Sequence, residues 1–306
     1  MTTTIKTETD LASRFVNGIL AIKPLANFAK HQARQMMIKR AEEIGVFWTK
    51  EAEKLQARDW SSDFAQVQNP DLNYPDYYVT SFHAYETGNL SWQAACEVES
   101  AARAVHAKIW QETESQGDAK LRQSFHDILK NSIFEQPQDI IDLGCSVGMS
   151  TFALQEVYPQ AQITGLDLSP YFLAVANYRS QERQANINWV HAQAESTGLA
   201  DATFDLVSIF LMCHELPQSA AHQIFAEARR ILRPGGHLAI MDMNPKSEIY
   251  KKMPTYVFTL LKSTEPYLDE YFSLDIEQAL IGAGFQTPTI TSNSPRHRTV
   301  IAQVSG

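Results

Sequence analysis

The chain has 306 residues, of which 44% are hydrophobic, and its 26 Lys or Arg against 35 Asp or Glu give a formal net charge of −9. This length allows one large domain or two ordinary ones. The negative charge argues against a nucleic-acid partner, which would need a broad basic face. No apolar run could span a bilayer and no signal peptide opens the chain, so we expect a cytoplasmic protein.

The three cysteines, Cys96, Cys145 and Cys213, are widely spaced, which favours a reducing compartment over a disulfide frame or a zinc site. The start of the chain is basic, because residues 1–40 hold seven Lys or Arg against Glu8 and Asp10. Its apolar stripe could give weak contact with an anionic membrane surface. Such a stripe more often packs on its own protein. It consists of Leu11, Phe15, Ile19 and Ile22.

Residues 1–60 read as helices, and Pro24 is expected to start or kink one of them. Residues 69–90, here called the lid segment, are instead irregular and rich in aromatic residues, prolines and polar side chains. Such a segment is costly to order unless it covers something. We expect a lid over a ligand site, and the alternative is a structural wrap that fills a domain junction. The candidate lining residues are Tyr77, Tyr78, His83, Tyr85 and Asn89.

Helices are predicted over residues 92–110 and 121–133, with a loop at 109–118 between them. From Asp139 onward, strands and helices alternate, which predicts an α/β fold with a parallel sheet and helices on both faces. Seven strands are expected, five of them in the parallel run. The predicted strands are 139–143, 162–168, 187–191, 204–210, 237–241, 285–291 and 299–304, and the helices between them are 150–157, 171–181, 219–232, 250–268 and 274–282.

A glycine turn joins the first predicted strand to its helix. Gly144 and Gly148 allow a sharp turn and a close approach of the backbone to a ligand. Ser146 stands where a dinucleotide site would need another glycine, and Asp142 would repel a phosphate but could pair with an ammonium group. Asp167 ends the next strand and can accept hydrogen bonds from both ribose hydroxyls. An ammonium group together with a ribose indicates S-adenosylmethionine.

These residues resemble the first motif of the class I S-adenosylmethionine-dependent methyltransferases, which reads Asp-Leu-Gly-Cys-Ser-Val-Gly from Asp142 to Gly148. The resemblance covers residues 139–306 and implies the Rossmann-like methyltransferase sheet. The alternative is an ordinary strand-to-helix turn with capping aspartates. The implied cofactor-binding residues are Asp142, Gly144, Cys145, Ser146, Gly148, Asp167, Leu168, Gln193, Ala194, Glu195 and Phe210.

The resemblance has one departure and one weaker extension. Gln193 stands where family members often have Asp, although its carbonyl oxygen can still accept from an adenine amino group. The region of the lid segment is similar to the N-terminal part of poorly characterised methyltransferases of cyanobacteria and plastids. We therefore expect residues 1–130 to form a helical cap and residues 131–306 the methyltransferase domain.

Methyl transfer from a sulfonium gains most from alignment of the reactants and exclusion of water. His214 follows the fourth strand, where methyl group and acceptor meet in this fold, and is the candidate base, with Glu215 orienting it or touching the acceptor. A capping or packing role for His214 is the alternative. No acidic set suggests a metal, and none is assigned.

The acceptor is expected to be small and lipophilic or aromatic, methylated on oxygen or carbon. Tyr256 and Tyr267, in the predicted insertion 250–268, are further candidates to line it. The motif of DNA amino-methyltransferases is missing after the fourth strand, and of the two glutamates that protein arginine methyltransferases need near that strand only Glu215 is evident. A protein side chain as acceptor, or a cofactor-binding interaction module without turnover, are the alternatives. The oligomeric state is not predicted.

Overall fold

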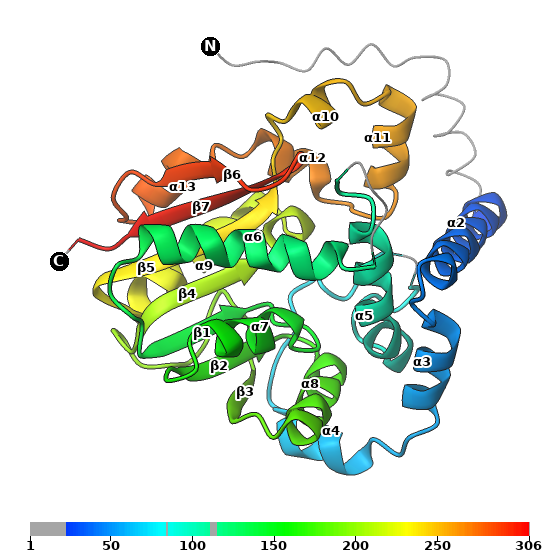
Figure 1. Ribbon diagram of the computed structural model, residues 1–306, viewed down its shortest axis with the longest axis horizontal. Coiled ribbons are helices and arrows are strands. Elements are labelled where there is room, and N and C mark those ends of the chain that lie inside the picture. Colours follow the sequence, from blue (N-terminus) through cyan, green and yellow to red (C-terminus); the bar gives the residue numbers. More distant parts are fainter. Residues whose placement is uncertain (1–22, 84, 111–114, 306) are drawn as a thin grey trace.

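A computed structural model describes residues 23–83, 85–110 and 115–305. A seven-stranded sheet lies at its centre, in the order β3-β2-β1-β4-β5-β7-β6 (Figure 1). The first five strands run parallel, and β7 is antiparallel to both β5 and β6. The strands are β1 (Asp139–Leu143), β2 (Gln162–Asp167), β3 (Ile187–His191), β4 (Phe204–Phe210), β5 (Leu232–Met243), β6 (Thr289–Ser292) and β7 (His297–Gln303).

The expected count of seven strands, five of them parallel, is confirmed, and β1, β3 and β4 have the predicted bounds. Strand β5 begins earlier than predicted, because Leu232 already pairs with Phe204 before a register shift. Strand β6 is shorter than predicted. Pro288 has no N–H to donate to the ladder, so only an isolated bridge between Phe285 and Val304 precedes it.

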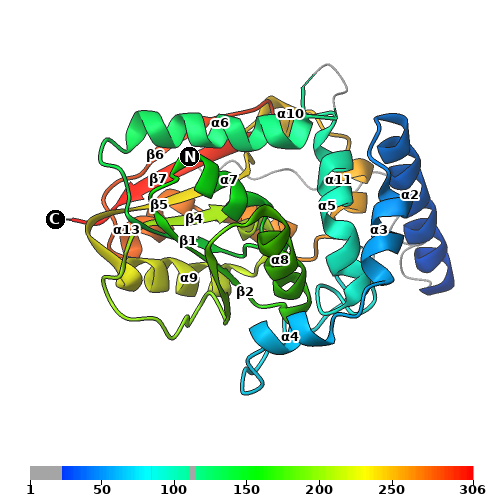
Figure 2. The ribbon, with the colours of Figure 1, turned by 60° about the horizontal axis from the view of Figure 1, so that its bottom comes forward.

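Helices cover both faces of the sheet (Figure 2), so the predicted fold class is confirmed. On one face α6 (Gly117–Ser132) and α7 (Met149–Val157) bury Phe125 and Leu154 against Ile140 of β1. On the other face α9 (Gln218–Ile231) and α13 (Ile276–Gly282) pack in a second apolar cluster. Helix α8 (Pro170–Arg183) lies beside β2 and β3, and the expected cap by Ser169 is present, since its Oγ accepts from the Phe172 amide.

The N-terminal helices lie at one side of this domain. Helices α2 (Lys23–Glu43) and α3 (Trp48–Gln56) pack on the outer side of α5 (Trp92–His106), and α4 (Ser61–Val67) packs on α8 (Figures 1 and 2). Pro24 stands in the first turn of α2. Helix α5 ends earlier than predicted because α6 begins against it, so closely that a Cβ on Gly117 would lie 2.3 Å from the His106 carbonyl oxygen.

The predicted membrane-contacting stripe, from Leu11 to Ile22, lies outside the described residues. Among the helices that the structure does describe, none combines the length and apolar character needed to cross a bilayer. The predicted division at residue 130 stays a prediction.

The predicted insertion 250–268 is divided into short helices, because Pro254 and Pro266 interrupt it. These are α10 (Glu248–Lys251), α11 (Thr255–Lys262) and α12 (Leu268–Ser273), drawn in orange at one end of the sheet (Figure 1). The lid segment reaches them, since the His83 amide donates to the Thr264 carbonyl oxygen at 3.0 Å.

Candidate functional site at the carboxyl edge of the sheet

The glycine turn between β1 and α7 has the predicted backbone. Gly144 and Gly148 have φ angles of +70° and +85°, which side-chain-bearing residues rarely adopt. There is also no room for a side chain. A Cβ on Gly144 would lie 2.3 Å from Met212 Sδ, and one on Gly148 would lie 2.7 Å from the Trp189 ring. Both positions therefore require glycine.

Asp142, at the end of β1, is fully buried. Its Oδ2 atom accepts hydrogen bonds from Ser150 Oγ and Thr151 Oγ1, both at 2.7 Å. Its Oδ1 atom is buried and has no hydrogen-bond partner. Burial raises the pKa of this carboxyl above its usual range, and the two hydroxyl groups oppose that shift. A buried acceptor that still needs a donor fits the ammonium group of S-adenosylmethionine.

Asp167, at the end of β2, is held by backbone amides. Its Oδ2 accepts from the Ser146 amide at 2.7 Å and its Oδ1 from the Ser169 amide at 2.8 Å. Burial raises the pKa of Asp167 to about 6, although these amides favour the ionised form. The carboxylate is thus fixed beside the glycine turn, where the sequence predicts a ribose partner.

The lid segment covers the loop that follows β3. The Asn69 amide donates to His191 Nδ1 at 2.9 Å, and the Tyr74 hydroxyl lies 3.3 Å from His191 Nε2. Further along, the Gln193 amide nitrogen donates to the Asn73 carbonyl oxygen, and the Tyr77 hydroxyl donates to the Glu195 carboxylate. The two polar side chains predicted beside the adenine are therefore engaged by the lid segment.

At the other side of the glycine turn, the 3₁₀ turn η1 (Cys213–Glu215) follows β4. His214 is buried there, with Nδ1 2.7 Å from Asp242 Oδ1 and its amide donating to Asp242 Oδ2 at 3.2 Å. Burial lowers the pKa of His214, but the Asp242 carboxylate overrides burial and raises it to about 10. This raised pKa favours a protonated His214 at neutral pH, so its role as a base stays a prediction.

Glu215 lies next to His214, and burial acts on its pKa in the opposite direction. Burial raises the pKa of its carboxyl to about 7, while His83 and His214 favour the ionised form. The His83 Nε2 atom is 3.7 Å from Glu215 Oε1 and 3.2 Å from Glu265 Oε1. Glu265 belongs to the loop between α11 and α12. The end of β4, the lid segment and the insertion thus meet at one cluster of ionisable groups.

Tyr77, Tyr78 and Tyr267 form the aromatic part of the site. The Tyr77 ring contacts those of Tyr78 and Tyr267 edge-on, at centroid distances of 6.5 and 6.2 Å. Burial of the Tyr78 hydroxyl, with Asp167 and Glu215 nearby, raises its pKa well above the ordinary value. Asn89 takes part through its backbone, because its carbonyl oxygen accepts from Ser169 Oγ at 2.8 Å.

Three predicted residues are not brought to these groups. The Tyr85 hydroxyl donates to Glu97 Oε2 of α5 at 3.1 Å, inside the apolar cluster of the N-terminal helices. Tyr256 is exposed on α11. Phe210 packs on Phe125 of α6, at a centroid distance of 5.8 Å, on the face of the sheet that α6 covers.

The other predicted cofactor residues line the strand ends as buried small or apolar groups. Leu168 and Ala194 are 8% exposed, and the Leu168 carbonyl oxygen lies 3.1 Å from His191 Nε2. Cys145 and Cys213 are fully buried near Asp167 and Asp242, and burial raises the pKa of both thiols well above the usual value. They are free thiols, as the sequence predicts.

Sequence reasoning missed Asp242 and Glu265. Asp242 stands near the carboxyl end of β5, so the strand-end rule that found Asp142 and Asp167 could have found it. Glu265 lies between two short helices and carries no such signal in the sequence.

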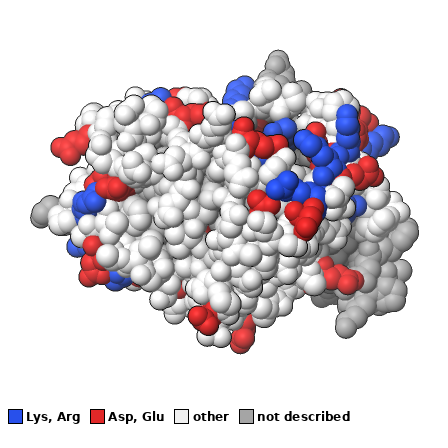
Figure 3. All heavy atoms as spheres, turned by 90° about the horizontal axis from the view of Figure 1, so that it is seen from below, with Lys and Arg blue, Asp and Glu red and all other residues white. Residues whose placement is uncertain are grey.

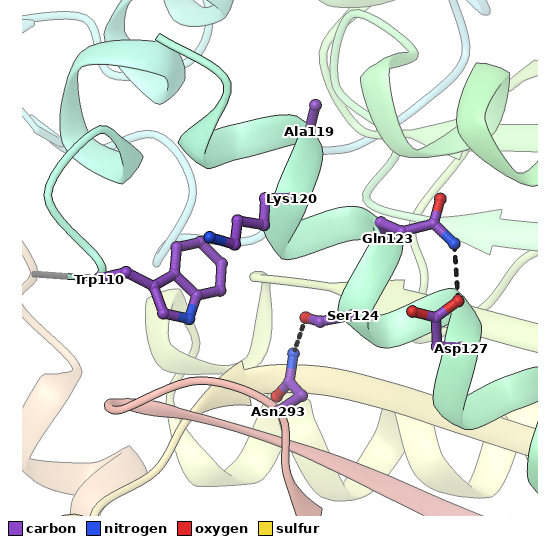
Figure 4. Close-up of a pocket in the computed structure, with 7 residues that line it drawn as sticks. All are labelled: Trp110, Ala119, Lys120, Gln123, Ser124, Asp127 and Asn293. Atoms are coloured by element: carbon purple, nitrogen blue, oxygen red, sulfur yellow. Dashed lines mark hydrogen bonds between the residues drawn. The ribbon is translucent and has the colours of Figure 1, made fainter. Parts of the chain in front are cut away.

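Hollows elsewhere on the surface contain none of the predicted site residues. One groove of about 530 Å³ lies between α6 and the β6–β7 loop, where Ser124 accepts from Asn293 Nδ2 at 2.9 Å (Figure 4). Another, of about 880 Å³, lies at the N-terminal helices near Trp60 and Trp92. On the face that Figure 3 shows, basic and acidic side chains are intermixed, and no broad basic area is seen.

Comparison with known proteins agrees with this geometry. Residues 140–236 match the family described as "Methyltransferase domain". The chain is 41% identical over 102 residues to the malonyl-[acyl-carrier protein] O-methyltransferase of Hahella chejuensis, covering 33% of this chain and 35% of that protein. It is 28% identical over 109 residues to the demethylmenaquinone methyltransferase of Thermus thermophilus, covering 36% of this chain and 49% of that protein. The chain thus spans a third to a half of these two relatives.

Among solved structures, a protein of Pyrococcus horikoshii superposes with a TM-score of 0.50 at 18% identity, covering 66% of this chain and 95% of that one, which supports the fold alone. The glycine turn, the two strand-end aspartates and the sheet order agree with the matched family. Residues 140–236 therefore form a methyltransferase domain of the class I S-adenosylmethionine-dependent type.

Proposed function

We propose that the protein transfers a methyl group from S-adenosylmethionine to a small acceptor that reacts through oxygen or carbon. The observation that carries this proposal is the placement of Asp142 and Asp167 on either side of one glycine turn. The unpartnered Oδ1 of Asp142 would accept from the ammonium group of the donor. Asp167, held by the Ser146 and Ser169 amides, would accept from the ribose hydroxyls.

The lid segment supports an enclosed site for a small molecule. It contacts Glu195 in the loop that follows β3, and through His83 it also reaches Glu215 and Glu265 near the end of β4. Since Tyr77 and Asn73 engage Glu195 and Gln193, we infer that the lid segment shifts to admit the adenine and then closes. Closure excludes water, which methyl transfer needs.

Tyr77, Tyr78 and Tyr267 offer aromatic surface to the acceptor. The name of one relative fits methylation on oxygen, and the name of the other fits a quinone-type acceptor. One relative is named as an O-methyltransferase and the other as acting on demethylmenaquinone. A phenol or an acidic carbon must lose a proton on methylation, whereas a carboxylate has already lost it at neutral pH. We assign that proton to Glu215, which exchanges a proton near neutral pH. His214, as an imidazolium, would stabilise negative charge on the acceptor.

The first test is isothermal titration with S-adenosylmethionine and its demethylated product. We expect micromolar binding by the native chain. Asp142→Asn and Asp167→Asn should each weaken it at least tenfold, because each removes a charged hydrogen bond of roughly 1.5–3 kcal/mol. Asp127→Asn, an exposed aspartate on α6, is the matched control and should bind normally. No binding by the native chain would reject the proposal and favour an interaction module.

The second test addresses turnover on phenols, quinones and carboxylic acids, with a protein extract as the competing acceptor. Glu215→Gln should reduce kcat by about 10²–10⁴-fold, the usual contribution of general base catalysis, and leave cofactor affinity unchanged. Methylation of protein side chains alone would reject the small-molecule acceptor.

A further inference from the structure

Three side chains from separate parts of the chain converge at the carboxyl end of β4. His83 comes from the lid segment, Glu215 from η1, and Glu265 from the loop between α11 and α12. One ligand atom of each, the imidazole nitrogen and two carboxylate oxygens, lies within 4.8 Å of the other two. No other such trio of His, Cys, Asp or Glu occurs in the described part of the chain.

The distances fit a metal ion. Two ligand atoms bonded to one ion at 2.0–2.2 Å lie roughly 2.8–3.6 Å apart in octahedral or tetrahedral geometry. His83 Nε2 is already 3.2 Å from Glu265 Oε1 and 3.7 Å from Glu215 Oε1. A cation could therefore be bound with shifts of a few tenths of an ångström at these two contacts.

In the described structure, the positive charge near the two carboxylates comes from histidines alone. Within the described residues, neither Glu215 nor Glu265 forms an ion pair with a lysine or arginine. Glu265 is 15% exposed, and its second oxygen, Oε2, is buried without a hydrogen-bond partner. A buried carboxylate oxygen without a partner is costly, and a coordinated cation would remove that cost.

We propose that His83, Glu215 and Glu265 form a divalent-cation site. A nitrogen ligand beside two carboxylates favours Zn²⁺, Mn²⁺, Fe²⁺ or Co²⁺ over Mg²⁺ and Ca²⁺, which prefer oxygen ligands alone. Three protein ligands leave coordination positions open for water or for an oxygen atom of a small molecule. This proposal revises the expectation of no metal, which rested on the lack of an acidic set in the sequence.

The site would also link parts of the protein that are distant in sequence. His83 is held in place by its own amide, which donates to Thr264, next to Glu265. A cation bound there would join the lid segment to η1 and to the insertion. This extension rests on the proposed methyl transfer: with an ion bound, Glu215 would be a ligand in place of the base, and the ion would face the acceptor. The cation site itself depends only on the three ligands.

The alternative occupant is a proton, because a protonated His83 can pair with both glutamates. The two cases are separated by titrating the chelator-treated protein with ZnCl₂ and MnCl₂ in a calorimeter and with CoCl₂ in a spectrophotometer. We expect one ion per chain, and visible absorption from Co²⁺. His83→Ala and Glu265→Gln should weaken binding at least tenfold. His222→Ala, which removes an exposed histidine of α9, should not change it.

Thermal unfolding without metal shows which variants are folded. If His83→Ala does not fold, the more conservative Glu265→Gln still provides the test. Unchanged metal affinity in a folded variant, or no metal binding by the native chain, would overturn the proposal. The alternative, a protonated His83 that pairs with both glutamates, would then hold. Titration of the same samples with S-adenosylmethionine separates the two proposals. Cofactor binding without metal binding rejects only the cation site.

Discussion

The hydroxyl of Tyr77 donates a hydrogen bond to the carboxylate of Glu195, and this contact joins the lid segment to the loop after β3. Burial and the neighbouring carboxylate raise the pKa of Tyr77 above its ordinary value, so the phenol keeps its proton and remains a donor. Glu195 is also the residue that the sequence predicts beside the adenine. We therefore expect this hydrogen bond to hold the lid segment against the loop after β3.

Tyr77→Phe should loosen the lid segment without removing its ring contacts. A hydrogen bond to a charged group contributes about 1.5–3 kcal/mol, so we expect amide hydrogen exchange in residues 73–80 to accelerate at least tenfold. Tyr178→Phe is the matched control, because Tyr178 donates to Glu182 on the surface of α8. Equal exchange in residues 73–80 for the native chain and Tyr77→Phe would show that this bond does not hold the segment.

Cofactor affinity should depend on pH through Asp167. Its pKa is raised to about 6 in the folded protein. The protonated group therefore contributes roughly 3 kcal/mol to the free energy of unfolding below pH 4, and this contribution is lost as pH rises through 6. Only the ionised form accepts from both ribose hydroxyls. We expect the Kd for S-adenosylmethionine to rise about tenfold per pH unit below 6, and calorimetry from pH 5 to 8 measures it. Asp167→Asn should bind weakly at every pH.

The charge on His214 can be tested directly by NMR of the imidazole nitrogens. Its pKa of about 10 implies no titration between pH 6 and 8.5. The raised pKa stabilises the fold below pH 6.5, and this contribution is lost as pH rises through 10. Asp242→Asn should lower the pKa of His214 toward neutrality. His126, whose pKa burial lowers to about 4, is the internal reference. A native His214 midpoint between 6 and 7 would contradict the imidazolium and restore the base.

Alanine at Gly148 should be more damaging than alanine at Gly45, although both have similar left-handed φ angles, +85° and +79°. Left-handed strain costs about 1–2 kcal/mol at either position. At Gly45 a Cβ meets nothing within 4 Å, whereas at Gly148 it would lie 2.7 Å from Trp189 and 2.8 Å from Phe152. Urea unfolding should therefore show a larger loss for Gly148→Ala, with weaker cofactor binding. Equal losses would mean that the rings move aside freely.

The parallel sheet could be predicted because buried parallel strands are short apolar runs, as in β1 and β4, and because their ends point to one edge. The same rule indicated Asp142 and Asp167. It missed Asp242 because the predicted fifth strand stopped at Met241, two residues before the strand ends. Site residues at strand ends can thus be predicted from local sequence, but only where the end of the strand is predicted accurately.

The rest of the site depends on contacts between distant segments, which periodicity does not encode. Glu265 meets His83 only because the insertion folds back over the sheet edge. Tyr85 was grouped with Tyr77 from composition, but a turn with a bridge between Phe82 and Tyr85 directs it into the N-terminal helices. The role of His214 was predicted from its position, while its charge is set by Asp242.

The burial of Cys145 and Cys213 affects how these two thiols would react with the methyl donor. A thiolate is a far better nucleophile than a thiol, and one placed beside a sulfonium would compete with the acceptor for the methyl group. Cys145 lies in the glycine turn and Cys213 follows β4, so both stand close to where the donor would bind. Burial and the nearby aspartates keep both thiols protonated. In the proposed reaction, these two sulfur atoms would therefore not compete with the acceptor for the methyl group.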